Sequence, residues 1–197
     1  MTILRVFADT NTLYPFYICD LLLRCSEEGL FEVLWTEDLL AELIEVIPRS
    51  GHKKTQAVQN MCAAIRNAFP NNEIPRSKYQ DLIDQMPGND PDDWLHSAAA
   101  IAGAAKILLT RDTSGFPEKT LARLGLRVTN VDQFLCEQFD IFPDDLIRIL
   151  DEQIKDLTRS RPTQSTLFDH LSRPTSAPKF VGRVRRYLGL VAQNHQI

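Results

Sequence analysis

Residues 3–9 read ILRVFAD, a short apolar run that ends in an aspartate. An apolar run of this length with β-branched residues predicts a buried strand. A second run of the same kind, KILLTRD at residues 106–112, also ends in an aspartate. Two more short apolar runs, at residues 31–35 and 126–128, bring the number of expected strands to four.

The segments between these runs carry apolar residues at helical spacing. Residues 15–28 begin at a proline, which suits a first helical turn, and the segment stops at a glycine. Strands that alternate with helices predict a parallel sheet with helices on both faces, so we expect an α/β fold. The helices expected in this part of the chain span residues 15–28, 36–48, 53–69, 78–85, 92–105, 118–124 and 131–139.

The composition restricts the class of protein. The chain has 197 residues, 44% hydrophobic and 24% charged, which suits one domain with a sizeable core and an appendage. No apolar run approaches the ~18 residues of a membrane-spanning helix, and the N-terminus lacks the pattern of a signal peptide. The four cysteines have neither disulfide-framework nor zinc-ligand spacing. We therefore expect a cytoplasmic protein with free thiols and no membrane contact.

Charge is distributed unevenly along the chain. Residues 1–145 hold 13 Lys and Arg against 22 Asp and Glu, a balance of −9, whereas residues 146–197 hold 9 against 4, a balance of +5. Near residue 141 the alternation of strands and helices also ends, and three further helices are expected, at residues 144–157, 162–171 and 178–190. We divide the chain into a domain at residues 1–140 and a basic helical C-terminal extension at residues 141–197.

Acidic residues lie where the strands are expected to end. Asp9 follows the first strand and Asp112 follows the third. Ligands of open parallel sheets bind beyond the carboxyl ends of the strands, where the strand order reverses. The helix that leads into the third strand begins near Asp93, at the same edge of the sheet, and Glu42 lies on a mostly apolar stretch of another helix.

Several carboxylates in one crevice would repel each other and resist ionisation, unless a cation lies between them. Oxygen ligands without His or Cys favour Mg²⁺ or Mn²⁺ over zinc. Such an ion can activate water and neutralise charge on a phosphodiester. The pattern therefore predicts metal-assisted phosphodiester hydrolysis.

Each acid also has a structural interpretation, and both remain open at this point. Asp9 could cap the following turn, and Asp93 could stabilise the first turn of its helix through the helix dipole. Asp112 could be a turn residue, and Glu42 could be a solvated acid. Only together, as four acids at one edge of a sheet, do they favour a functional site.

Four segments in order resemble the PIN domain family. The first strand and acid of that family resemble VFADTNTLY at residues 6–14, and its helical glutamate resembles LLAEL at residues 39–43. Its third acid, at a helix start, resembles DPDDWLHSAAA at residues 90–100. Its final strand and acid resemble LTRDTSGFP at residues 109–117. The resemblance covers roughly residues 3–135.

The resemblance implies a three-layer α/β/α sandwich with a central parallel sheet. Many PIN domains are Mg²⁺- or Mn²⁺-dependent ribonucleases, and bacterial members are often VapC-type toxins of toxin–antitoxin pairs. This chain looks like the VapC-type branch with a C-terminal extension. The implied partners are RNA, a cognate antitoxin and a second copy of the chain in a homodimer.

The resemblance also implies roles for individual residues. Asp9 and Asp93 would be the principal metal ligands, and Asp112 would complete the shell directly or through water. Glu42 would orient a water or a second ion. Asn11, Asp92 and Thr110 would support these ligands from around the site.

One position departs from the family pattern. Relatives often carry a further acid before the phenylalanine of the last loop, where this chain has Gly115. The set of four acids is then complete only if Asp112 supplies the fourth carboxylate.

An alternative function is a non-catalytic PIN-like module that binds RNA or a protein. The basic C-terminal residues, among them Lys179, Arg183 and Arg186, would then contact phosphate. The contrasting interpretation is a helix that only packs on the body of the protein or on an antitoxin. A DNA-directed nuclease on the same site also fits the sequence.

Overall fold

Four strands pair in one sheet in the computed structural model, which describes residues 3–49, 55–113, 115–158 and 164–194. The strands are β1 (Arg5–Ala8), β2 (Glu32–Leu34), β3 (Ile107–Leu109) and β4 (Arg127–Thr129). Their order is β2-β1-β3-β4 and all pairs are parallel, with Val6 opposite both Val33 and Ile107. The strand order reverses between β1 and β3, so the switch point of the sheet lies there.

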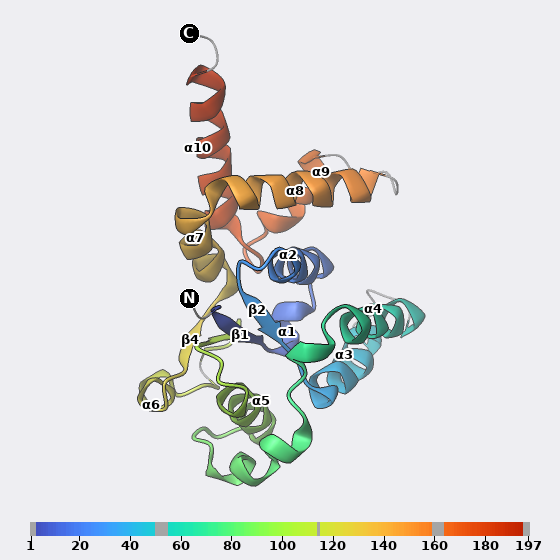
Figure 1. Ribbon diagram of the computed structural model, residues 1–197, viewed down its shortest axis with the longest axis vertical. Coiled ribbons are helices and arrows are strands. Elements are labelled where there is room, and N and C mark those ends of the chain that lie inside the picture. The colour runs from blue at the N-terminus through green and yellow to red at the C-terminus, as the bar shows by residue number, and fades with distance from the viewer. Residues whose placement is uncertain (1–2, 50–54, 114, 159–163, 195–197) are drawn as a thin grey trace.

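Helices cover both faces of this sheet (Figure 1). α2 (Phe16–Glu27) and α7 (Val131–Ile141) lie on one face, and α5 (Pro91–Ala102) and α6 (Glu118–Arg123) lie on the other. The strands are buried from both sides, which explains why they read as continuous apolar runs. The expected α/β fold with a three-layer arrangement is confirmed.

The connection from β2 to β3 is long. It contains α3 (Glu37–Arg49) and α4 (Thr55–Ala68), which pack on each other. Three short 3₁₀ turns follow, namely η1 (Pro70–Asn72), η2 (Arg76–Lys78) and η3 (Gln80–Gln85). This connection places α3 beside α1 (Thr10–Leu13), the short helix that directly follows β1.

The element boundaries differ from expectation in a few places. The segment 78–85 forms 3₁₀ turns where a short helix was expected, because so few residues give little cooperative α-helix stability. α3 ends at Arg49, one residue after Pro48, because proline lacks an N–H donor and its ring disfavours continuation of the helix. Residues 53–54 and 162–163 of the expected helices lie outside the described residues.

The last three helices pack against the body of the molecule (Figure 1). They are α8 (Pro143–Thr158), α9 (Gln164–Leu171) and α10 (Pro178–Asn194). α8 lies along α2, where Arg148 Nη2 is 2.7 Å from Glu28 Oε2 and Gln153 Nε2 donates a hydrogen bond to the Tyr17 carbonyl at 3.0 Å. α10 packs on α7.

All four cysteines, Cys19, Cys25, Cys62 and Cys136, are buried and free, as expected for thiols that serve as small apolar residues. Burial raises the pKa of the Cys25 thiol. Among the described residues, no helix combines the length and apolarity needed to cross a membrane.

Candidate functional site

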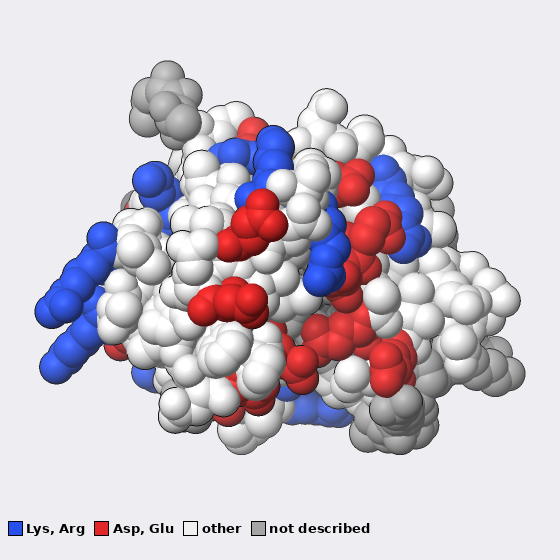
Figure 2. Space-filling model, turned by 90° about the horizontal axis from the view of Figure 1, so that it is seen from below, with Lys and Arg blue, Asp and Glu red and all other residues white. Residues whose placement is uncertain are grey.

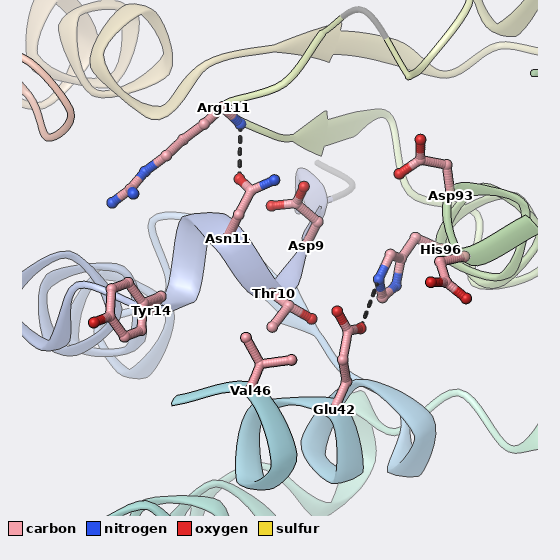
Figure 3. Close-up of a pocket in the computed structure, with 10 residues that line it drawn as sticks. Asp9, Thr10, Asn11, Tyr14, Glu42, Val46, Asp93, His96 and Arg111 are labelled. Carbon is pink, nitrogen blue, oxygen red and sulfur yellow. Dashed lines mark hydrogen bonds and ion pairs between the residues drawn. The ribbon is translucent and has the colours of Figure 1, made fainter. Parts of the chain in front are cut away.

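A pocket of about 230 Å³ opens at the switch point of the sheet. Acidic side chains reach it from three directions: Asp9 after β1, Glu42 on α3 and Asp93 on α5 (Figure 3). Viewed from below, the protein also carries acidic side chains close together over the middle of its surface, with basic ones beside them (Figure 2). The lining residues of the pocket are Asp9, Thr10, Asn11, Tyr14, Glu42, Val46, Asp92, Asp93, His96 and Arg111.

Asp9 is fixed in place by backbone contacts. Its N–H donates to the Leu109 carbonyl at 3.0 Å, which extends the pairing of β1 with β3 by one residue. Its Oδ1 accepts a hydrogen bond from the Thr12 N–H at 3.0 Å and so caps α1. The residue is only 4% exposed, and this burial raises the pKa of its carboxyl despite the hydrogen bonds from Thr110 and Thr12. The structural and functional interpretations of Asp9 are therefore compatible.

Asp93 lies in the first turn of α5, which Asp90 caps. Burial and the charges of Asp90, Asp9 and Asp112 raise the pKa of the Asp93 carboxyl to about 6, against the opposing effect of His96. A Cβ atom added to Gly115 would lie 2.0 Å from Asp93 Oδ2. The glycine therefore leaves free the space that the Asp93 carboxylate occupies.

Glu42 is held by His96. The His96 Nε2 atom lies 3.0 Å from Glu42 Oε2, and the imidazole is almost fully buried beside the Phe7 ring. Burial has the largest single effect and acts to raise the pKa of Glu42, but hydrogen bonds from His96 and Thr10 and the charge of His96 together outweigh it, so the pKa is lowered. Glu42 is therefore ionised at neutral pH. His96 is thus both buried and one of the residues that line the pocket.

The other predicted residues lie around this centre. Asp112 lines a neighbouring open hollow that Asp93 also lines, rather than the pocket of Asp9. Thr110 is buried, and its Oγ1 accepts a hydrogen bond from the Asp112 N–H at 3.1 Å. Asn11 Oδ1 accepts from the Arg111 N–H at 2.9 Å and so joins α1 to the loop after β3. Asp92 is an exposed residue on the rim of the pocket.

The donor chemistry of the pocket suits a hard divalent cation, since carboxylate oxygens predominate and negative charge is in excess. Within the described ranges, however, no three Asp, Glu, His or Cys side chains are grouped closely enough to hold a metal ion. Asp9 and Asp93 both line the pocket. Their carboxylates would need to turn toward a common point to share an ion.

Arg111 and Tyr14 are two lining residues that the sequence analysis did not select. Figure 3 shows both side chains extending away from Asp93. Arg111 Nε is buried without a hydrogen-bond partner, and burial lowers the pKa of its guanidinium. The position of Arg111, directly after a strand at the switch point, is the sequence signal that could have identified it.

Comparisons with known proteins match two parts of the chain. A family model described as the PIN domain matches residues 5–114, and a model described as the VapC50 C-terminal domain matches residues 131–186. No curated protein and no solved structure matches the chain. The first match covers more than half of the 197 residues and contains all four predicted acids.

Proposed function

Because the chain belongs to the PIN domain family and is of the VapC type, we propose that it is an endoribonuclease that depends on Mg²⁺ or Mn²⁺. At family level the protein is a nuclease of the VapC-like toxin kind. Its proposed reaction is hydrolysis of RNA phosphodiester bonds. Its proposed role is that of the toxin in a type II toxin–antitoxin pair in the cytoplasm.

One observation supports the proposal above all. Asp9, Glu42 and Asp93 come from three separate elements and line a single pocket at the switch point. Burial raises the pKa of Asp9, and burial together with the charges of Asp90, Asp9 and Asp112 raises that of Asp93, so the ionised forms of these carboxylates are poorly stabilised by the protein alone. A bound divalent cation would stabilise them.

Each acidic residue of the pocket has its own role in the proposed reaction. Asp9 and Asp93 would hold the ion, with Asp112 close enough to influence Asp93 electrostatically. A divalent ion in such a site supplies positive charge to the phosphate and acidifies a water molecule. Glu42, ionised and oriented by His96, can accept a proton from the attacking water.

The test uses the purified full-length chain. Labelled single-stranded RNA, and DNA of the same sequence, are incubated with Mg²⁺, with Mn²⁺ or with EDTA. We expect cleavage of RNA with either metal and none with EDTA. Asp9→Asn and Asp93→Asn should lower the rate at least a hundredfold, while the matched control Asp84→Asn, an exposed acid outside the pocket, should retain it.

Three outcomes would contradict the proposal in different ways. RNA binding without cleavage under every metal condition would favour the non-catalytic module. Cleavage of DNA alone would show that the substrate is DNA and not RNA. Cleavage that survives both substitutions would place the reaction elsewhere in the molecule.

The biological role has its own test. Induced expression of the wild-type chain in bacteria should arrest growth, and Asp9→Asn should remove the effect. A cognate antitoxin encoded beside this gene should copurify with the chain and restore growth. Light scattering of the purified protein should give the mass of a homodimer.

A further inference from the structure

A second hollow of about 410 Å³ adjoins the acidic pocket. Phe16 and Tyr17 at the start of α2 line it. His170, near the end of α9, and Arg173, just after that helix, line it as well. We call it the extension groove. Tyr14 and Arg111 line both this groove and the acidic pocket, so the two hollows are neighbours.

The extension groove is basic, in contrast to the acidic pocket. Arg111 and Arg173 line it, and among the described residues no Asp or Glu does. In the part of the chain that the structure describes, neither arginine is within salt-bridge distance of a carboxylate. The buried Nε of Arg111 also lacks a hydrogen-bond partner. Arg111 is half-buried and Arg173 is exposed. Two guanidinium groups that line one hollow suit an anionic ligand, because they can donate charge-assisted hydrogen bonds to it.

The groove is also aromatic. The Tyr17 ring stacks on the His170 imidazole, with ring centroids 4.3 Å apart and an interplanar angle of 23°. Phe16 meets Tyr17 edge to face, with centroids 6.0 Å apart. Phe16 and Tyr17 are only partly buried. Partly exposed rings beside arginines form the kind of surface on which unpaired bases stack while phosphates bind the cations.

We propose that the extension groove binds the single-stranded RNA next to the bond that is cut, with Arg111 and Arg173 on its phosphates and the α2 aromatic residues on its bases. This inference rests on the proposed nuclease function. An acidic peptide would fit the arginines, but it has no bases to stack on the rings of Phe16 and Tyr17. A nucleic acid chain suits both ends, because its phosphates are spaced along it and its bases stack.

The proposal makes the C-terminal extension part of the substrate site. The contribution comes from His170 and Arg173 at the end of α9, and not from the basic residues of α10 that the sequence suggested. On α10, Arg183 pairs with Asp140 and Tyr187 Oη donates to Asp144 at 2.6 Å. These side chains fasten α10 to the body of the protein.

Binding is measured by fluorescence anisotropy with a 5′-fluorescein 12-nucleotide RNA of mixed sequence. EDTA is present so that metal-dependent cleavage stops. Arg173→Ala should raise Kd about tenfold and reduce the slope of log Kd against log salt by about 0.7, the value for one phosphate contact on a single strand. The matched control Arg123→Ala removes an exposed arginine on α6 and should change neither quantity.

A second variant tests whether the effect of Arg173→Ala could come from a local change of structure instead of the loss of charge. Thr175 is an exposed residue of the groove, so Thr175→Glu should weaken binding by repulsion, whereas Thr175→Gln should not. With Mg²⁺ present, Arg173→Ala should raise KM for the 12-nucleotide RNA. Equal Kd and salt slope for Arg173→Ala, Thr175→Glu and the controls would overturn the proposal, and would leave the groove to a protein partner.

The two proposals fail in different ways. If RNA binding depends on Arg173 but no RNA is cleaved with either metal present, the nuclease function is refuted and RNA binding in the extension groove is supported. Cleavage with RNA binding that is indifferent to Arg173 and Thr175 would do the reverse.

Discussion

At the scale of single residues, Asp93 combines partial burial with acidic neighbours, and both raise its pKa to about 6 from an ordinary value of 3.8. A group whose pKa is raised by folding favours the folded state while it is protonated. Its contribution to stability is therefore present below pH 4 and is lost as the pH rises through 6. At neutral pH the Asp93 charge should destabilise the fold.

We predict that Asp93→Asn stabilises the metal-free protein at pH 7.5 while it abolishes cleavage. One pKa unit corresponds to about 1.4 kcal/mol, and because solvent screens this partly exposed group we expect a gain of ~1 kcal/mol. Urea unfolding at pH 7.5 and pH 4 measures it, and the gain should shrink at pH 4. Asp84→Asn serves as the control, and an Asp93→Asn protein that is less stable at pH 7.5 would contradict the prediction.

The sequence allowed us to predict which acids line the candidate site, but not where each of their side chains lies. Asp9 and Asp93 follow from a strand end and a helix start, both of which have periodic signals. Asp112 lies in a loop, where no periodicity indicates the direction of a side chain, and its carboxylate lines the neighbouring hollow. His96 follows Asp93 by three positions on α5, so the helical repeat brings both to one side.

At the scale of secondary-structure elements, one buried acid of α7 caps the start of α10. Asp132 is 8% exposed, and its carboxylate accepts hydrogen bonds from the N–H groups of Lys179 at 3.2 Å and Phe180 at 2.8 Å. These are orphan donors in the first turn of α10. The Phe139 ring meets the Phe180 and Tyr187 rings edge to face beside this contact.

We predict that Asp132→Ala lowers the free energy of unfolding by about 1–2 kcal/mol, as the loss of a helix cap does. Trypsin should then cut α10 faster, at Arg185 or Arg186. Asp144→Ala is the matched control, because it removes an exposed carboxylate that also bonds to α10 and should cost less than ~0.5 kcal/mol. Equal effects of the two substitutions would show that Asp132 is not the principal attachment.

The helices and strands themselves were largely predictable, because each long element has an apolar period. The short α1 was not expected, since four residues carry no period and the helix depends on its Asp9 cap. α10 also runs to Asn194, beyond the expected residue 190. The division of the chain at residue 140 stays a prediction.

At the scale of the whole molecule, the extension covers apolar surface of the body. Leu146, Ile149 and Leu150 of α8 are at most 2% exposed and belong to one continuous core with the α2 residues. Burial of each such side chain contributes about 2 kcal/mol.

We predict that a chain ending at residue 142 loses most of its stability, because α2 would be uncovered. The soluble yield should fall and the binding of an apolar dye should rise. A chain ending at residue 189, which keeps α8 and α9, is the control and should remain folded. A soluble, cooperatively unfolding chain of residues 1–142 would show that the body folds without the extension.

The distribution of charge along the sequence predicted a basic C-terminal extension, but it did not show what each basic side chain contacts. A count of arginines does not reveal which ones pair within the protein, and Arg183 is paired with Asp140 while Arg173 lines a groove. The parallel sheet, in contrast, was predicted from the alternation of strands and helices, and it places the carboxyl ends of the strands at one edge. Ion pairs between residues far apart in the sequence can be identified only from the tertiary structure.

The stacking of Tyr17 on His170 joins two halves of the chain that are more than 150 residues apart. A gene rearrangement that exchanged C-terminal halves between relatives would separate this pair and leave each ring beside an unsuited neighbour. The two halves should therefore be inherited as one unit. In a collection of relatives, changes at the first position should accompany changes at the second.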